Sequence, residues 1–313
     1  MKVAIFDLGS NTTKLLVAEI AERGRPQVVA EESRSCRLTT GGGNKFSFSE
    51  ETIDRLLAVL TELMKIARDH EVDRMKAVAT EAFRKSENSQ ELVALAQASL
   101  GLPISVLTGL EEAGAIAAGL LSDPSIERFD DFHALDLGGG SMEVIAVKER
   151  EVTSVESFPL GAAVVSNRFC PDSVRPWSDQ ACLDAQKHVQ SFLNGSHAPV
   201  LSTPCSTLVG AGGTLVFLRK ILENESDRQR NGKGVLKLSD SINLFDRLSK
   251  MTLSQRVDSY PSLPPSRADI FPAGLLVLNE ITSHYGRKEI IHSYRNLRHG
   301  IASGLGMKDS LFV

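Results

Sequence analysis

The chain has few cysteines, and it lacks long apolar runs. Its four cysteines are scattered without CxxC spacing, so the sequence indicates neither a disulfide framework nor a zinc site. No apolar run approaches the roughly 18 to 20 residues of a membrane-spanning helix, and the N-terminus lacks the apolar region and cleavage site of an export signal. We therefore expect a cytoplasmic protein without a membrane partner.

Excess positive charge and several familiar catalytic motifs are also missing. The formal net charge is -4 and the pI is near 6.0, and basic residues do not alternate with aromatic ones, which argues against a nucleic-acid partner. The seven histidines form no HExxH, and there is no GxSxG, so zinc-peptidase and α/β-hydrolase chemistry are not indicated. Any polyanionic ligand must be bound by a local basic site.

The chain does contain two short aspartate-glycine segments, DLGSN from Asp7 and DLGGGS from Asp136. Each aspartate ends an apolar run, and each glycine turn leads into a second apolar run, so both segments are predicted to be β-hairpins. Glycine allows backbone amides to approach an anion, and aspartate can hold a divalent metal that offsets phosphate charge. A single such aspartate could simply open a turn, but a repeated pair favours a clamp for one polyphosphate.

The pattern of elements in the first half is repeated in the second. The 313 residues, 42% of them hydrophobic, are enough for two domains. Apolar spacing predicts strands at 27–30, 75–79, 104–107, 152–158, 207–209 and 289–292, and helices at 53–67, 89–100, 110–121, 160–169, 178–193, 214–222, 239–250, 266–285 and 297–305, with a solvated loop at 223–233. Together with the hairpins, the first half has the order βββαβαβα.

This plan resembles the actin-like ATPase superfamily. Within it, the chain resembles the exopolyphosphatase and guanosine pentaphosphate phosphatase (Ppx/GppA) family over nearly its whole length. Five segments carry the resemblance in the expected order: FDLGSNTTKL at Phe6, VATEAFR at Val78, LTGLEEA at Leu107, LDLGGGSMEV at Leu135 and VGAGGT at Val209. FPLGAA at Phe158 and SYRNLRHGI at Ser293 are weaker matches.

The resemblance implies an α/β fold with two duplicated actin-like (ribonuclease H-like) domains around a central cleft. We expect the N-terminal domain at residues 1–124 and the C-terminal domain at 125–296. In the family the last helix packs on the N-terminal domain, so residues of about 297–313 would complete it. The chain stops after the second domain and so resembles the short, two-domain form.

The resemblance also implies a set of site residues. Asp7, Asp136 and Glu143 would hold Mg²⁺ or Mn²⁺, and Glu143 would also act on water. Phosphate groups would be bound by Arg84 and by backbone and hydroxyl groups of the three loops, namely Ser10, Asn11, Thr12, Gly138, Gly139, Gly140, Ser141, Gly212, Gly213 and Thr214. The alternatives are ordinary turn residues, a surface arginine and, for Glu143, a solvated strand residue.

Two adjacent glutamates precede an alanine-rich helix. Thr108 and Glu111 match a capping box, which explains Glu111 without catalysis. Glu112 projects about a quarter turn away from it. The family places its water-activating base at this second glutamate, so Glu112 is the expected base, and the alternative is a favourable charge at a helix N-terminus.

The chain departs from the family pattern at one position. The residue that follows Glu-Glu-Ala is usually arginine in the family, and here it is Gly114. One phosphate-binding charge is then absent, and Lys14, Arg37, Lys45 or Arg298 are the cations that could compensate.

The expected activity is magnesium-dependent removal of a terminal phosphate from inorganic polyphosphate, or of the 5′ γ-phosphate from guanosine pentaphosphate. Two alternatives stay open: an ATP-dependent small-molecule kinase of the same superfamily, and a sensor that binds guanosine penta- or tetraphosphate without turnover. A kinase would usually need an aspartate base, and none is evident. Monomer and homodimer both remain open.

Overall fold

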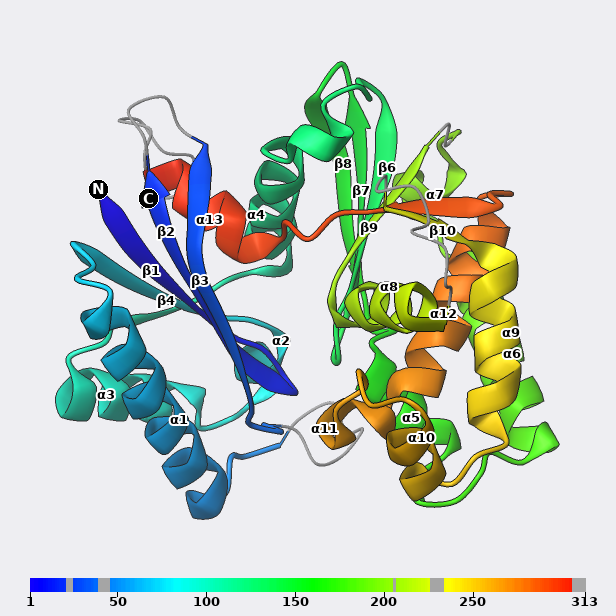
Figure 1. The fold of residues 1–313 in the computed structure, drawn as a ribbon, viewed down its shortest axis with the longest axis horizontal. Coiled ribbons are helices and arrows are strands. Elements are labelled where there is room, and N and C mark those ends of the chain that lie inside the picture. The colour runs from blue at the N-terminus through cyan, green and yellow to red at the C-terminus, as the bar shows by residue number, and fades with distance from the viewer. Residues whose placement is uncertain (21–24, 39–45, 205–206, 226–233, 306–313) are drawn as a thin grey trace. The chain divides into compact units, whose positions relative to one another are not determined.

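The computed structural model describes residues 1–20, 25–38, 46–204, 207–225 and 234–305. The chain divides into two compact units (Figure 1). Unit 1 consists of Met1–Asp123 together with the segment from Arg295 onward, and unit 2 consists of Pro124–Tyr294. The polypeptide therefore returns to unit 1 after completing unit 2.

A five-stranded sheet forms the centre of unit 1, with the strand order β3-β2-β1-β4-β5. The antiparallel strands are β1 (Lys2–Leu8), β2 (Thr12–Ile20) and β3 (Pro26–Ser35), and the strands parallel to β1 are β4 (Arg74–Ala79) and β5 (Ile104–Val106). The helices are α1 (Glu50–Asp69), α2 (Glu81–Lys85), α3 (Ser89–Leu100), α4 (Gly109–Leu121) and α13 (Leu297–Leu305). The predicted βββαβαβα order is present, with the short α2 as an addition.

Helix α1 shows how the sequence determines these elements. The amide of Thr52 donates to the Ser49 hydroxyl at 3.3 Å, which caps the first turn. Leu56, Leu60 and Leu63 then follow at helical spacing and are fully buried. They join a core that includes Phe6 and Leu15 of the sheet.

The last described helix, α13, packs against α4 (Figure 1). Arg298 on α13 is 6% exposed, and its Nη1 donates to the carbonyl of Leu15 at 2.8 Å. Its Nη2 forms an ion pair with Glu31 at 2.8 Å. The guanidinium therefore attaches the C-terminal segment to β2 and β3, so the structure gives Arg298 a packing role rather than the compensating phosphate contact considered above.

Acidification is expected to destabilise the protein through His299. This imidazole is 2% exposed, and burial, followed by the charges of Arg298 and Arg295, lowers its pKa from 6.5 to about 3. Between these values the unfolded chain binds a proton that the folded chain does not, so the free energy of unfolding falls as pH falls, by about 1.4 kcal/mol per unit. Urea unfolding at about pH 7 and about pH 4.5 should therefore show that the free energy of unfolding falls more for wild type than for His299→Gln. Equal losses would contradict a buried neutral imidazole.

A six-stranded sheet forms the centre of unit 2, with the order β10-β11-β9-β6-β7-β8. The strands are β6 (Phe132–Leu137), β7 (Met142–Lys148), β8 (Glu151–Phe158), β9 (Leu208–Ala211), β10 (Val235–Lys237) and β11 (Glu289–His292). The helices are the 3₁₀ turn η1 (Pro124–Ile126), α5 (Ala162–Phe169), α6 (Asp179–Gly195), α7 (Pro199–Ser202), α8 (Gly213–Glu225), α9 (Leu238–Ser249), α10 (Leu253–Ser259), α11 (Pro265–Ala268) and α12 (Phe271–His284). The central strands β6, β9 and β11 are parallel.

The single helix predicted at 266–285 is wrong, because the segment forms the two helices α11 and α12. Pro272 has no amide hydrogen, so it cannot donate to the carbonyl of Ala268 four residues earlier. The fully buried Arg256 instead donates to that carbonyl through Nη1 at 3.2 Å, and through Nε to the carbonyl of Leu248 at 2.9 Å. Pro272 was the signal of the break.

Other predicted elements differ in extent. Strand β3 is longer than 27–30, helix α8 extends into the predicted loop as far as Glu225, and α7, β10 and α10 were not predicted. Residues 226–233 of that loop lie outside the described part. No helix in the described part of the chain is long and apolar enough to cross a membrane.

Candidate active site

The carboxyl ends of β1, β4 and β5 lie at one edge of the unit 1 sheet. In the parallel register, Leu8 is opposite Ala79, which is opposite Val106. The hairpin loop follows β1, helix α2 follows β4, and helix α4 follows β5. This edge, where ligands of open α/β sheets bind, therefore gathers the predicted residues of unit 1. They are Asp7, Ser10, Asn11, Thr12, Arg84 and Glu112.

The tip of the first hairpin is a tight, well-supported turn. The amide of Gly9 donates to the carbonyl of Thr12 at 3.1 Å. The segment that follows β3 then runs beside the tip, because the amide of Cys36 donates to the carbonyl of Asn11 at 3.0 Å and that of Leu38 donates to the carbonyl of Ser10 at 2.8 Å. Ser10 and Thr12 are each 7% exposed.

Arg84 and Glu112 form an ion pair at this edge. Arg84 Nη1 lies 2.7 Å from Glu112 Oε2 and also donates to the carbonyl of Leu107 at 2.8 Å. Glu112 is only 7% exposed, and burial of an unpaired carboxylate would be strongly unfavourable. Arg84, whose side chain is 24% exposed, therefore offsets the charge of a glutamate that lies below the surface.

The adjacent Glu111 has a different environment. Its amide donates to the Thr108 hydroxyl at 3.2 Å, while its Oε2 accepts from the amide of Thr108 at 2.7 Å, so the predicted capping box is confirmed. The hydrogen bonds that the Thr108 amide and, at 2.9 Å, the Thr108 hydroxyl donate to this carboxylate lower the pKa of Glu111, and the bond from the amide has the largest effect. Glu111 thus caps the helix, whereas Glu112 is a buried ion-pair partner.

Each hairpin places its aspartate opposite a charged residue of the neighbouring strand. Asp7 is paired with Lys14, whereas Asp136 is paired with Glu143. Residues directly opposite in antiparallel strands have side chains on the same face of the sheet. Lysine therefore offers a positive charge beside Asp7, whereas two carboxylates lie beside one another in unit 2.

Glu143 is held in place from β8. It is 2% exposed, and the hydroxyl of Ser157 donates to its Oε1 at 2.8 Å. Ser157 is also its register partner, so Asp136, Glu143 and Ser157 form a row across three strands. The alternative of a solvated strand residue is therefore wrong for Glu143.

Gly212 brings the second predicted loop of unit 2 against Asp136. Its φ is +94°, a conformation that residues with a side chain rarely adopt. A Cβ at this position would lie 2.5 Å from Asp136 Oδ1 and 2.7 Å from the carbonyl oxygen of Leu137. The absence of a side chain therefore allows the loop after β9 to approach the carboxylate at the end of β6.

The first loop of unit 2 is fixed by helix α5. The amides of Ala162 and Ala163 donate to the carbonyls of Gly138 and Gly139 at 3.0 and 2.8 Å. A Cβ on Gly161 would lie 2.3 Å from the carbonyl carbon of Gly140. The FPLGAA segment is therefore a support for the glycine loop, a role that the sequence comparison with the family did not identify.

Arg267 is a further residue that the sequence did not identify. A Cβ on Gly213 would lie 3.3 Å from its Nη2 and from its guanidinium carbon, so this half-buried cation lies against the loop that begins α8. Thr214 on the same loop is 5% exposed. The sequence separation of Arg267 from Gly213 left no local signal for this contact.

A divalent cation fits the pair formed by Asp136 and Glu143. Two neighbouring carboxylates repel each other, and a shared divalent cation would offset that repulsion. In the described ranges, no group of three or more His, Cys, Asp or Glu side chains could hold a metal ion. Mg²⁺ usually takes one or two carboxylates and completes its shell with water and substrate phosphates.

The cations considered as replacements for the missing arginine have different positions. Arg37 is exposed, and its amide donates to the carbonyl of Asn11 at 3.0 Å, so it adjoins the first hairpin tip. Lys14 is half-buried opposite Asp7. Lys45 lies outside the described residues. Gly114 itself has open space, since a Cβ there would meet no atom within 4 Å.

Comparison with known proteins identifies the family of the chain. Residues 16–308 match the model of the Ppx/GppA phosphatase family. The chain is 28% identical to exopolyphosphatase 2 of Mycobacterium tuberculosis over 316 aligned positions, which cover 98% of both chains.

Solved structures give the same result for the fold. A Ppx/GppA enzyme of Aquifex aeolicus has a TM-score of 0.77 at 26% identity, covering 97% of this chain and 99% of that one. An exopolyphosphatase of Cytophaga hutchinsonii has a TM-score of 0.84 at 23% identity and 98% coverage of both chains, which is evidence of a shared fold. The prediction of a duplicated actin-like fold is confirmed, and the chain belongs to the Ppx/GppA phosphatase family.

Proposed function

We propose that the protein is a phosphoanhydride hydrolase that releases terminal phosphate from inorganic polyphosphate, the 5′ γ-phosphate from guanosine pentaphosphate, or both. The main observation is the buried Glu112 carboxylate held by Arg84 at the edge that also carries the first hairpin tip. The name of the Mycobacterium tuberculosis relative, an exopolyphosphatase, supports the substrate class.

The loops and two arginines bind the phosphoryl groups in this proposal. Backbone amides and hydroxyls of residues 10–12, 138–141 and 212–214 donate to phosphoryl oxygens, since tight turns and helix starts present such donors. Arg84 uses Nη1 for Glu112, and a guanidinium has five N–H groups, so it can keep that pair and also donate to phosphate. Arg267 adds positive charge beside Gly213.

Glu112 acts as the general base. An ionised carboxylate accepts a proton from water as the water oxygen attacks the terminal phosphorus, and the bond to the bridging oxygen breaks as the shortened chain leaves. Arg84 orients the carboxylate and keeps it ionised. The helix cap formed by Glu111 fixes the first turn of α4, from which Glu112 projects.

Asp136 and Glu143 are the residues that would hold Mg²⁺ or Mn²⁺, and Asp7 stays a predicted ligand. A bound divalent cation supplies charge neutralisation for the phosphoryl oxygens. Ser157 fixes the orientation of Glu143 by its 2.8 Å hydrogen bond, so this carboxylate is prepared for a ligand before substrate arrives.

Introducing the missing arginine should strengthen substrate binding. In Gly114→Arg, the Cβ has open space, and the added guanidinium supplies the charge usual in the family. We expect the KM for polyphosphate to fall roughly threefold to tenfold, the range of a charge-assisted hydrogen bond that is partly exposed. Gly114→Ala is the control, because it raises helix stability by about 1 kcal/mol without adding charge. A KM that falls equally in both variants, or in neither, would show that this position does not face phosphate.

One assay separates the hydrolase from the kinase and the sensor. Phosphate release is measured from polyphosphate, guanosine pentaphosphate and ATP, with Mg²⁺ and with chelator. The proposal predicts metal-dependent release from polyphosphate or guanosine pentaphosphate without an acceptor. ATP consumption that needs a sugar or acid would identify a kinase, and binding of the guanosine nucleotides without any release would identify a sensor.

A further inference from the structure

A pocket that could bind an anion lies at the amino ends of the central strands of unit 2, opposite the end that carries the glycine loops. A pocket of about 500 Å³ is lined by residues that precede β6, β9 and β11, including Arg128, Thr207 and Lys288. The loops at 138–141 and 212–214 follow the other ends of β6 and β9. A six-residue strand is roughly 20 Å long, so the pocket and these loops are separate sites.

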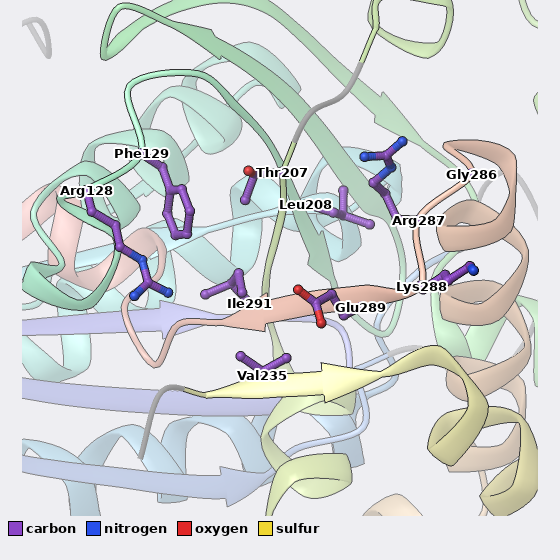
Figure 2. A pocket seen from close by; sticks show the side chains of 10 residues that line it. All are labelled: Arg128, Phe129, Thr207, Leu208, Val235, Gly286, Arg287, Lys288, Glu289 and Ile291. Carbon is purple, nitrogen blue, oxygen red and sulfur yellow. The ribbon is translucent and has the colours of Figure 1, made fainter. Parts of the chain in front are cut away.

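The pocket is positively charged on a chain whose net charge is -4. Its lining includes three cations, Arg128, Arg287 and Lys288, and one carboxylate, Glu289. Figure 2 shows Arg128 at one end, Arg287 and Lys288 at the other, and Glu289 between them. A local surplus of positive charge on an acidic protein favours an anionic ligand at that place.

Arg287 is held in position by the backbone around it. Its Nε donates to the carbonyl of Tyr285 at 3.1 Å, and its amide donates to the carbonyl of Thr282 at 3.0 Å. The guanidinium therefore keeps its positive charge at this end of the pocket, where it attracts the phosphate groups of an anionic ligand.

Apart from Thr207, the remaining side chains of the lining are apolar, which distinguishes between anions. Phe129 and Ile291 lie toward the Arg128 end in Figure 2, and the Arg128 guanidinium lies 4.7 Å from the centre of the Phe129 ring. Planar aromatic rings stack on such surfaces. Inorganic polyphosphate has no apolar part that would use them, whereas a nucleotide base does.

We propose that this pocket binds a nucleoside di- or triphosphate. Arg287 and Lys288 bind its phosphates, the base packs toward Phe129, and Glu289 accepts hydrogen bonds from ribose hydroxyls or base amino groups. Carboxylates have that role toward ribose in other nucleotide sites. The inference is independent of the proposed function, because none of these residues acts on the hydrolysed phosphoryl group.

Binding of ADP and GDP by titration calorimetry, in the presence of chelator, tests the proposal. Arg128→Glu combined with Lys288→Glu reverses two exposed charges and should weaken binding at least tenfold. The matched control, Lys187→Glu combined with Lys250→Glu, makes the same change of net charge at exposed positions outside the pocket and should bind as wild type does. Circular dichroism and the Tm of each variant verify that it is folded.

Two further arms identify the ligand class and the site. Arg84→Ala should bind ADP as tightly as the wild type does. If Arg84→Ala loses ADP binding while the pocket variant keeps it, the nucleotide binds at the candidate active site and the proposal is wrong. In the Arg84→Ala background, tripolyphosphate should bind more weakly than ADP, and the difference should disappear when the two pocket charges are also reversed. Equal binding of ADP by the pocket and control variants, or tighter binding of tripolyphosphate at the pocket, would also overturn it.

Discussion

Glu112→Gln is expected to reduce kcat for phosphate release by roughly a hundredfold to ten-thousandfold, the usual contribution of a general base. The amide has the shape of the carboxylate and can still accept the hydrogen bond from Arg84 Nη1, now 2.7 Å from Glu112 Oε2. It cannot take a proton from water. Because phosphate binding is left largely intact, the KM should change by less than about threefold, so the loss falls on kcat.

The neighbouring glutamate provides the matched control. Glu111→Gln changes the same kind of side chain, and glutamine also serves in a capping box, so helix α4 and the rate should both be retained. Phosphate release and thermal unfolding are measured for both variants. If Glu112→Gln releases phosphate at the wild-type rate, or if Glu111→Gln loses as much activity as Glu112→Gln, Glu112 is not the general base.

Gly212→Ala is expected to impair both stability and activity. The new Cβ would lie 2.5 Å from Asp136 Oδ1 and 2.9 Å from the amide of Leu137, and the residue would have to keep a φ of +94°. Left-handed strain of about 1–2 kcal/mol and overpacking of about 1–3 kcal/mol together give an expected loss of roughly 2–5 kcal/mol in the free energy of unfolding. Displacement of Asp136 should also reduce kcat by more than about tenfold, because a site misplaced by about 1 Å loses much of its rate.

Gly195→Ala is the control in the same unit. A Cβ at Gly195 meets no atom within 4 Å, and the residue ends helix α6, where alanine is favoured over glycine. Urea unfolding should therefore show an unchanged or slightly raised stability, with normal phosphate release. A Gly212→Ala variant as stable and active as Gly195→Ala would show that the close approach to Asp136 is not needed.

Regular periodic segments were predictable from the sequence because one face of each packs on a core. Helix α3, strand β11 and helix α13 begin and end at the predicted residues. Strand β10 was missed because three residues are too few to show a period of two, and it exists through its pairing with β11. The break between α11 and α12 was missed although Pro272 indicated it.

The candidate site was predictable only where its residues are near in sequence. The cap of Glu111 follows from the spacing Thr108-x-x-Glu111, and the structure confirms it. The cross-strand pairing of Asp136 with Glu143 depends on the hairpin register, which could not be predicted from the sequence. The contact of Arg267 with Gly213 depends on tertiary packing, for which local pattern gives no signal.

Isotope incorporation tests the central claim most directly. Wild-type protein is incubated with polyphosphate and Mg²⁺ in water enriched in ¹⁸O, and the released phosphate is analysed by mass spectrometry. Attack of water on the terminal phosphorus predicts one ¹⁸O atom in each released phosphate. Released phosphate without label would show that water attacks the adjacent phosphorus and that the bridging oxygen leaves with the terminal phosphate, and it would contradict the proposed reaction.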